Sequence, residues 1–320
     1  MRTSPLQAGR VLTLAPRRSW SERTWGLWLV APALGIVGVL MLAPIVGAIG
    51  MSLQRRLPIF GISEFVGLRN YLLLAQDDRF WAACRTTLYF TGVAVAAELA
   101  LGLGMALLLH HAGTKLSQAK RGLWQGALYA VVLIPWTVPT VVSARIWEWL
   151  YQPEYGLLNY LLMATGLART PINWLGDPDW VIHAAILMDV WKTAPFAALL
   201  LLAGLKAIPR DLYQAAVVDG AGRWAIFSRI TLPLLLPVIL IVLVFRTMDT
   251  MRVFDAVYVL TGGGPGNSTE TLSIYAYKTL FQTLQFGYGS AQAVIMFALV
   301  MLMTAAYLLM LRQHMKELAR

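Results

Sequence analysis

The sequence is poor in the residues on which disulfide bonding and most active-site chemistry depend. Its 320 residues include one cysteine, Cys84, so no disulfide can form within the chain. The four histidines are scattered and show no metal-ligand spacing, and the chain contains no Gly-Lys-Ser/Thr sequence that could hold a nucleotide phosphate. We find no nucleophile–base pair either. These absences predict a protein that is not an enzyme, binds no metal and holds no cofactor of its own.

Charged residues are also scarce. They make up 13% of the chain, about half the share of a soluble protein, while 58% of residues are hydrophobic and the mean hydropathy is +0.63. Six stretches are long enough to cross a bilayer of ~30 Å, which takes about 20 residues each. Because backbone groups in lipid must pair internally, we expect an all-α polytopic membrane protein with six transmembrane helices. The stretches are Trp25–Gly50, Thr87–Leu109, Leu123–Ala144, Trp180–Leu205, Ile230–Thr250 and Phe286–Leu311.

Positive charge is concentrated on one side of this arrangement. With the N-terminus inside, the inner segments hold fifteen of the 26 Lys and Arg residues against four acidic ones, whereas the outer loops hold nine of each. The positive-inside rule therefore predicts that both termini are cytoplasmic. Nucleic-acid binding is a poor explanation of this charge, because no soluble domain carries it. The predicted organisation is a cytoplasmic tail (1–24), a transmembrane domain (25–311) with a cytoplasmic loop at 206–233, and a second cytoplasmic tail (312–320).

Five ionisable residues lie inside the apolar stretches, where each costs about 2.5–3.5 kcal/mol at a helix centre. Four of them form two pairs spaced three residues apart, each followed by a threonine, so each set shares one helical face and its charges can pair. Two such faces predict a polar pathway, and the alternative is that each pair only neutralises itself inside the bundle. The sets are Asp189 and Lys192 with Thr193, and Arg246 and Asp249 with Thr250.

The fifth ionisable residue, Glu98, has no partner within its own helix. Contact with another helix explains it as well as a function does, so we leave it outside the predicted site. The third apolar stretch contains Pro135-Trp136-x-x-Pro139-Thr140. Two prolines free backbone carbonyls, which is tolerated where a helix lines a cavity, and a simple kink is the alternative.

The loop at 206–233 is a polar, helix-like piece between two long apolar stretches. Its pattern is Gln214-Ala215-Ala216, three residues, Gly220, nine residues and Ile230-x-Leu232-Pro233. This pattern resembles the EAA loop of ABC importer permeases, whose coupling helices dock into the ATPase subunits. Gln214 stands where that family usually has Glu, so hydrogen bonding is kept and the charge is lost. We expect Gly220 at a bend with no room for a side chain. The resemblance implies a coupling role for Tyr213, Gln214, Ala215, Ala216, Asp219, Gly220, Ala221 and Phe227.

Further motifs extend the resemblance from about Leu88 to the C-terminus. They are Trp191-Lys192-x-x-Pro195-Phe196, Leu205-Lys206-Ala207-Ile208-Pro209, Phe254-Asp255-x-x-Tyr258-Val259-Leu260-Thr261-Gly262-Gly263-Gly264-Pro265 and Thr269-Glu270-Thr271-Leu272. They are similar to the sugar-permease branch of the family, and more narrowly to its maltose/trehalose-type first permease subunits. The resemblance implies the type I importer permease fold, with sugar contacts from the middle of three helices. The matching positions are Trp136, Thr140, Asp189, Lys192, Thr193, Arg246, Asp249 and Thr250.

The resemblance also implies a function and partners. We expect the permease subunit of an ATP-driven importer for a sugar, a disaccharide such as trehalose or maltose, in a bacterial or archaeal plasma (inner) membrane. The implied partners are a second permease in a heterodimer, two ATP-binding subunits that use ATP and Mg, an extracellular or periplasmic sugar-binding protein, and membrane lipid. The alternative is a proton-coupled secondary transporter that uses Asp189, Asp249 and Glu98 as a relay. Inverted repeats would favour that alternative, and the sequence shows none.

Overall fold

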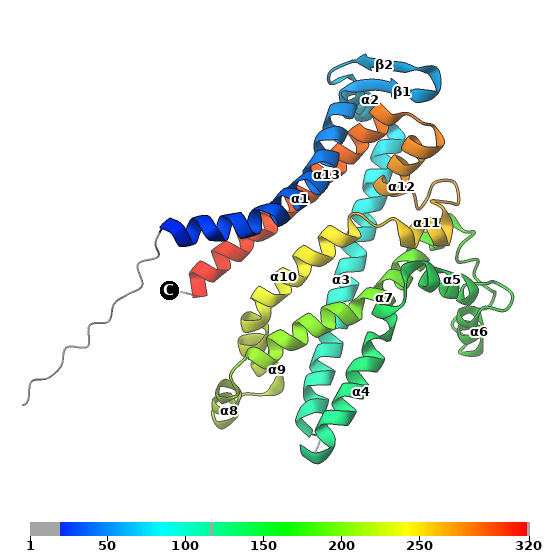
Figure 1. Cartoon of the computed structure of the whole chain (residues 1–320). Helices are drawn as coiled ribbons and strands as arrows, with labels where there is room; N and C mark the ends of the chain where they lie inside the picture. The colour runs from blue at the N-terminus through cyan, green and yellow to red at the C-terminus, as the bar shows by residue number, and fades with distance from the viewer. Residues whose placement is uncertain (1–19, 116–117, 319–320) are drawn as a thin grey trace, which may run out of the picture. The chain divides into compact units, whose positions relative to one another are not determined.

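The computed structural model describes residues 20–115 and 118–318, and helices dominate this part of the chain (Figure 1). Most of the two predicted tails lies outside these residues or at their edges. Within the described residues, five helical segments are long and apolar enough to cross a membrane, and a bent pair of helices provides a sixth. The prediction of an all-α polytopic protein is thus confirmed. The five are Thr24–Ser52, Asp78–His111, Pro178–Ala207, Arg223–Thr250 and Phe286–Gln313.

The chain divides into two units, Met1–Gly50 and Met51–Arg320. The described part of the first unit belongs to one helix, α1 (Trp20–Ser52), which contains Pro32 and Pro44. Large apolar side chains are exposed along its length, including Trp28 and Leu40. A helix that is apolar on every side needs lipid or protein around it, as expected for a membrane span.

The second unit carries the remaining elements. It begins with a β-hairpin that the sequence analysis did not predict, made of β1 (Gln54–Leu57) and β2 (Ile62–Phe65) with the 3-10 turn Pro58–Phe60 between them. The longer helices are α3 (Asp78–Lys115), α4 (Gln118–Thr137), α7 (Pro178–Ala207), α10 (Leu232–Thr250) and α13 (Phe286–Leu318). The shorter ones are α2 (Arg69–Ala75), α5 (Thr140–Leu150), α6 (Leu157–Ala164), α8 (Arg210–Val218), α9 (Arg223–Ile226), α11 (Asp255–Thr261) and α12 (Leu272–Tyr277), with π-helical turns at Phe227–Thr231 and Lys278–Gln282.

The third predicted span is broken and does not run straight to Ala144. Helix α4 ends at Thr137, α5 begins at Thr140, and the two meet at an angle of 88°. Pro139 lacks an N–H group and disfavours helical backbone at Val138, so the helix stops before it. The two prolines therefore mark a sharp break that leaves backbone carbonyls without helical partners, more than a simple kink would.

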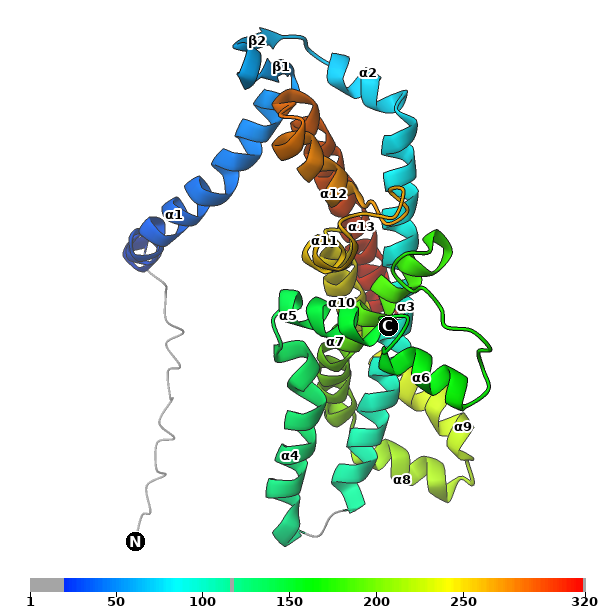
Figure 2. The ribbon, with the colours of Figure 1, turned by 90° about the vertical axis from the view of Figure 1, so that its right-hand side faces the viewer.

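Helices α3, α7 and α10 lie side by side at the centre of the second unit (Figures 1 and 2). Small residues allow α3 and α7 to approach closely. A Cβ atom added at Gly102 would lie 2.9 Å from the Cβ of Ala197 and 3.1 Å from the backbone nitrogen of Ala198. Backbones that approach this closely gain dispersion contacts, the main source of helix association in lipid.

Two apolar clusters fill the interior of this bundle. One contains Phe90 of α3 and Met188 of α7, and the other contains Leu109 of α3, Leu205 of α7 and Leu235 of α10. Each of these side chains is buried. Near the middle of α3 and α7, where the two clusters adjoin, the interior also holds the polar residues Glu98, Asp189 and Thr193.

A network of ion pairs stabilises the region of the second unit around α12. Glu270 accepts hydrogen bonds from Arg79 (2.7 and 2.8 Å) and forms an ion pair with Lys278 (2.8 Å). Burial by itself would raise the pKa of Glu270, but the hydrogen bonds from Arg79 and Lys278 outweigh it and hold the pKa below its ordinary value. Nearby, burial and a hydrogen bond to Asp77 raise the pKa of Tyr275 to about 12. This network ties α3, the loop before α12 and the turn after it together.

Candidate functional site

A polar cavity of about 370 Å³ opens where α5, α7, α10 and the start of α11 meet. Seven of the eight residues predicted from the sequence as sugar contacts line it, although they come from segments up to 110 residues apart. The other lining residues were not predicted as sugar contacts. The lining consists of Thr140, Asp189, Lys192, Thr193, Arg246, Asp249, Thr250, Arg252, Val253, Phe254, Asp255 and Ala256.

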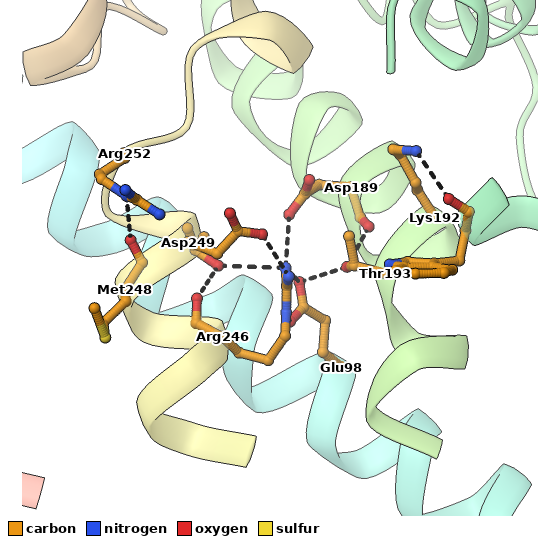
Figure 3. Close-up of polar contacts among 10 residues, drawn as sticks. Glu98, Asp189, Lys192, Thr193, Arg246, Met248, Asp249 and Arg252 are labelled. Atoms are coloured by element: carbon orange, nitrogen blue, oxygen red, sulfur yellow. Dashed lines mark hydrogen bonds and ion pairs between the residues drawn. The ribbon is translucent and has the colours of Figure 1, made fainter. Parts of the chain in front are cut away.

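Arg246 lies at the centre of a cluster of three carboxylates (Figure 3). Its Nε and Nη2 atoms donate to the two oxygens of Glu98 at 2.5 and 2.9 Å. Its Nη1 donates to Asp249 Oδ2 at 2.8 Å, which confirms the pairing predicted from their spacing. Asp189 Oδ2 lies 3.8 Å from Nη2 on the third side. One guanidinium therefore links α3, α7 and α10.

Glu98 was left out of the predicted site, and the structure shows what it does. Its side chain is fully buried, and it accepts a further hydrogen bond from Thr193 Oγ1 at 2.8 Å. A buried carboxylate needs a cation and satisfied oxygens, and Arg246 and Thr193 supply both. The sequence signal was its position mid-span, but both partners lie on other helices, so spacing along α3 could not identify them.

The predicted ion pair between Asp189 and Lys192 is wrong. Lys192 Nζ instead donates to the carbonyl oxygens of Val138 at 2.5 Å and Trp136 at 3.4 Å. Both carbonyls border the break between α4 and α5. Lys192 thus satisfies acceptors that the helix break exposes, and Asp189 turns toward Arg246.

Two of the three predicted threonines, Thr193 and Thr250, donate their hydroxyl protons to other groups of the protein. Thr193 Oγ1 lies 2.6 Å from the carbonyl oxygen of Asp189 as well as near Glu98, and Thr250 Oγ1 donates to the carbonyl of Arg246 at 2.6 Å. Such bonds to the preceding turn are common for threonine in helices. Both residues line the cavity, but the groups they offer to a ligand are oxygen lone pairs and methyl groups.

Trp136 is the one predicted sugar contact that does not line the cavity. Its indole stacks on the ring of Phe196, with centroids 5.4 Å apart and planes 16° apart. The aromatic residue at the cavity is Phe254, which stacks on Tyr258 at 5.0 Å and 15°. Both belong to the Phe254-Asp255-x-x-Tyr258 motif. The motif was noted as part of the family resemblance, but Phe254 was not predicted as a sugar contact.

The predicted coupling loop folds as two short helices around Gly220. Helix α8 ends at Val218, Gly220 has φ of +75°, and α9 begins at Arg223. The bend is confirmed, but the predicted lack of room is wrong, because a Cβ at Gly220 would meet nothing within 4 Å. The left-handed backbone, and not crowding, is what favours glycine there.

The loop's predicted residues divide between the inside and the surface. Ala216 is buried, and the Tyr213 hydroxyl lies 3.2 Å from Thr231 Oγ1, closing the base of the loop. Gln214 is exposed, as are the apolar side chains of Val218 (87%) and Trp224 (76%). The sequence analysis did not select Val218 or Trp224. Exposed apolar side chains at a polar loop are typical of a protein contact surface.

Among the described residues, no group of three or more His, Cys, Asp or Glu side chains could hold a metal ion. The polar cavity is instead suited to hydrogen bonding. Its acceptors and its stacked aromatic pair provide the two kinds of contact that a small polyhydroxylated molecule uses.

Comparison with known proteins identifies the family. Residues 99–317, which include the whole cavity lining, match the binding-protein-dependent transport system inner membrane components. The chain belongs to this family. One relative is the trehalose/maltose transport system permease protein MalF of Thermococcus litoralis, 43% identical over 92% of this chain and 96% of that protein. Another is the sulfoquinovosyl glycerol transport system permease protein SmoG of Agrobacterium fabrum, 40% identical over 91% of each chain.

Solved structures agree on the fold. A bacterial ABC transporter involved in the import of the acidic polysaccharide alginate contains a chain with TM-score 0.76 at 23% identity, covering 91% of this chain and 96% of that one. Family and fold together make this chain a multi-pass membrane permease of the ABC importer type, and a transport component rather than an enzyme. The alternative of a proton-coupled secondary transporter is therefore set aside.

Proposed function

We propose that this chain is one of two permease subunits of an ABC importer for a sugar, a disaccharide such as trehalose or maltose. The observation that carries the proposal is the polar cavity between α5, α7 and α10, since it gathers seven of the residues selected as sugar contacts. Two relatives, a trehalose/maltose and a sulfoquinovosyl glycerol transport system permease protein, support the sugar class.

The chemistry of the cavity suits a saccharide. Carboxylate oxygens of Asp189 and Asp249 accept hydrogen bonds from sugar hydroxyl groups, while the face of Phe254 packs on the C–H face of a pyranose ring. A volume of about 370 Å³ falls in the range of small-molecule sites. The second permease would complete the path on the open side of the cavity.

The coupling loop is proposed to dock into an ATP-binding subunit. Val218 and Trp224 would supply the buried apolar part of that contact, because both are almost fully exposed in this chain. Two ATP-binding subunits would bind and hydrolyse ATP with Mg, and this chain would hold no cofactor. Closure of those subunits would push on α8 and α9 and shift the bundle between its two access states.

The orientation follows from charge. The C-terminal end of α3 and the N-terminal end of α4 lie at the same end of the second unit as α8 and α9 (Figures 1 and 2). Basic residues are enriched in both segments. This supports a plasma-membrane protein in which the loop at 206–233 and both tails are cytoplasmic, and the sugar-binding protein docks on the opposite side.

Reconstitution tests the function directly. The chain is co-expressed with its second permease, ATP-binding subunits and binding protein, and ATP-dependent uptake of trehalose, maltose and other saccharides into vesicles is measured. We expect Asp249→Asn to reduce sugar uptake about tenfold while basal ATPase activity persists. The matched control Glu148→Gln, which removes a carboxylate outside the cavity, should leave uptake unchanged. An assembled complex that moves no saccharide would refute the proposal.

A further inference from the structure

The cavity's cations and acceptors are unequally available to a ligand. Arg246 is the most buried cation of the lining, with a side-chain exposure of 5%, and its three nitrogens are all directed to carboxylates. A guanidinium saturated in this way offers little attraction to a further anion. Arg246 is therefore a positioning residue, which holds Glu98 and Asp249 in place.

The second cation of the lining is also occupied. Lys192 Nζ donates to the carbonyl oxygens of Val138 and Trp136 at the helix break. Two of its three N–H groups are thus engaged, so an anionic ligand would find one donor left on Lys192. Arg252, which also lines the cavity, differs because its side chain is exposed and its Nε donates to the Met248 carbonyl at 3.0 Å, while no carboxylate pairs with it among the described residues.

Acceptor atoms, by contrast, are available. Asp189 Oδ2 is buried and has no hydrogen-bond partner among the described residues. Asp249 gives Oδ2 to Arg246, but 63% of its side chain stays exposed at the cavity. Carboxylate oxygens accept hydrogen bonds and cannot donate them. The cavity therefore offers an acid group few unengaged donors, namely those of Arg252 and a third N–H of Lys192, and it offers hydroxyl groups the acceptor atoms of two carboxylates.

We propose that this cavity selects uncharged saccharides over acidic ones, with Asp189 and Asp249 as the residues that decide the selection. The inference rests on the proposed sugar transport and deepens it. A hydroxyl group satisfies Asp189 Oδ2, whereas a carboxylate or sulfonate on the sugar meets two like charges at short range. Rejection by like charge in a partly desolvated site is an effective source of specificity.

The test measures binding to the assembled transporter in nanodiscs without its binding protein, so that the permease cavity alone sets the result. The neutral probes are trehalose and maltose. The acidic probes are sulfoquinovosyl glycerol and trehalose with one 6-hydroxymethyl group oxidised to a carboxylate. Dissociation constants come from titrations followed by saturation-transfer NMR, in the wild type and in Asp189→Asn, Asp249→Asn and Arg252→Gln. Glu148→Gln is the control for losing one carboxylate elsewhere.

We expect the wild type to bind a neutral probe at least about tenfold more tightly than the acidic probes. Asp189→Asn and Asp249→Asn should shrink that ratio severalfold, and Glu148→Gln should leave it unchanged. Thermal unfolding of each assembly checks that the variants fold, and the exposed Asp249 gives a second reading if Asp189→Asn is unstable.

Other outcomes would overturn the inference in distinct ways. If an acidic probe binds as tightly as a neutral one or more tightly, and Arg252→Gln abolishes that binding, Arg252 recruits acids and the inference fails. The proposed sugar transport would still stand. Absence of binding by any probe, in an importer that nonetheless moves sugars with its binding protein, would remove the cavity as the selecting site. If the complete importer moves neither class, the proposed function itself fails.

Discussion

Removing the charge of Arg246 should destabilise the protein more than removing the charge of its main partner, Glu98. The change Arg246→Gln leaves Glu98, which is fully buried, with no cation in contact among the described residues. Leaving one member of a buried ion pair alone costs about 3–5 kcal/mol. The reverse change, Glu98→Gln, leaves Arg246 with Asp249 at 2.8 Å and Asp189 at 3.8 Å, so it should cost about 1.5–3 kcal/mol.

A double-mutant cycle isolates this interaction. In the double variant Glu98→Gln with Arg246→Gln the charge of Glu98 is gone, while Asp189 and Asp249 still lose their cation. Part of the loss should therefore be recovered, and the coupling free energy should reach about 2 kcal/mol. The assay is denaturant unfolding of the purified assembly in mixed detergent micelles, followed by tryptophan fluorescence. Arg145→Gln is the control, because its ion pair with Glu148 is exposed at 65% and 34% and should contribute less than about 1 kcal/mol.

Two results would contradict this reasoning. One is a cost for Arg246→Gln no larger than that for Arg145→Gln. The other is additive costs for Glu98→Gln and Arg246→Gln, which would show that the two side chains do not share one buried pair. Neutralising Arg246 together with Asp249 would not test this pair, because that double change leaves the buried carboxylate of Glu98 without its cation.

Three further predictions concern other parts of the chain. Asparagine tolerates left-handed backbone and β-branched residues do not. We therefore expect Gly220→Asn to keep most substrate-stimulated ATPase activity and Gly220→Val to lose it. Equal loss in both variants would refute the backbone argument. Lys192→Met should speed amide hydrogen exchange around Val138 about ten- to a hundredfold, and unchanged exchange would show that Lys192 does not hold the break. The pKa of Glu270 is lowered in the folded state, so its contribution to the free energy of unfolding is full above its unfolded pKa near 4.5 and is lost as pH falls through the folded pKa. The unfolding temperature of the wild type should therefore drop more steeply on acidification than that of Glu270→Gln. Parallel curves would argue against the network.

The membrane architecture could be predicted from the sequence, because composition and the length of apolar runs reflect the solvent around each segment. The long apolar stretches all became helices, and the proline pair in the third one became a break between α4 and α5. The i,i+3 spacing of Arg246 and Asp249 predicted a real ion pair, since both lie on one helix and the helical repeat sets their separation. The glycine in the coupling loop likewise marked a real left-handed bend.

The contacts between polar residues on different helices could not be predicted from the sequence, because they depend on how the helices pack. Asp189 and Lys192 share a helical face just as Arg246 and Asp249 do, yet Lys192 turns to the carbonyls of the α4–α5 break and Asp189 turns to Arg246. Glu98 had no sequence signal for a partner, because its cation lies 148 residues away. Pairing within a helix follows from its periodicity, whereas pairing between helices depends on their packing, which here lets α3 and α7 approach at Gly102 and places the charged residues where two apolar clusters adjoin.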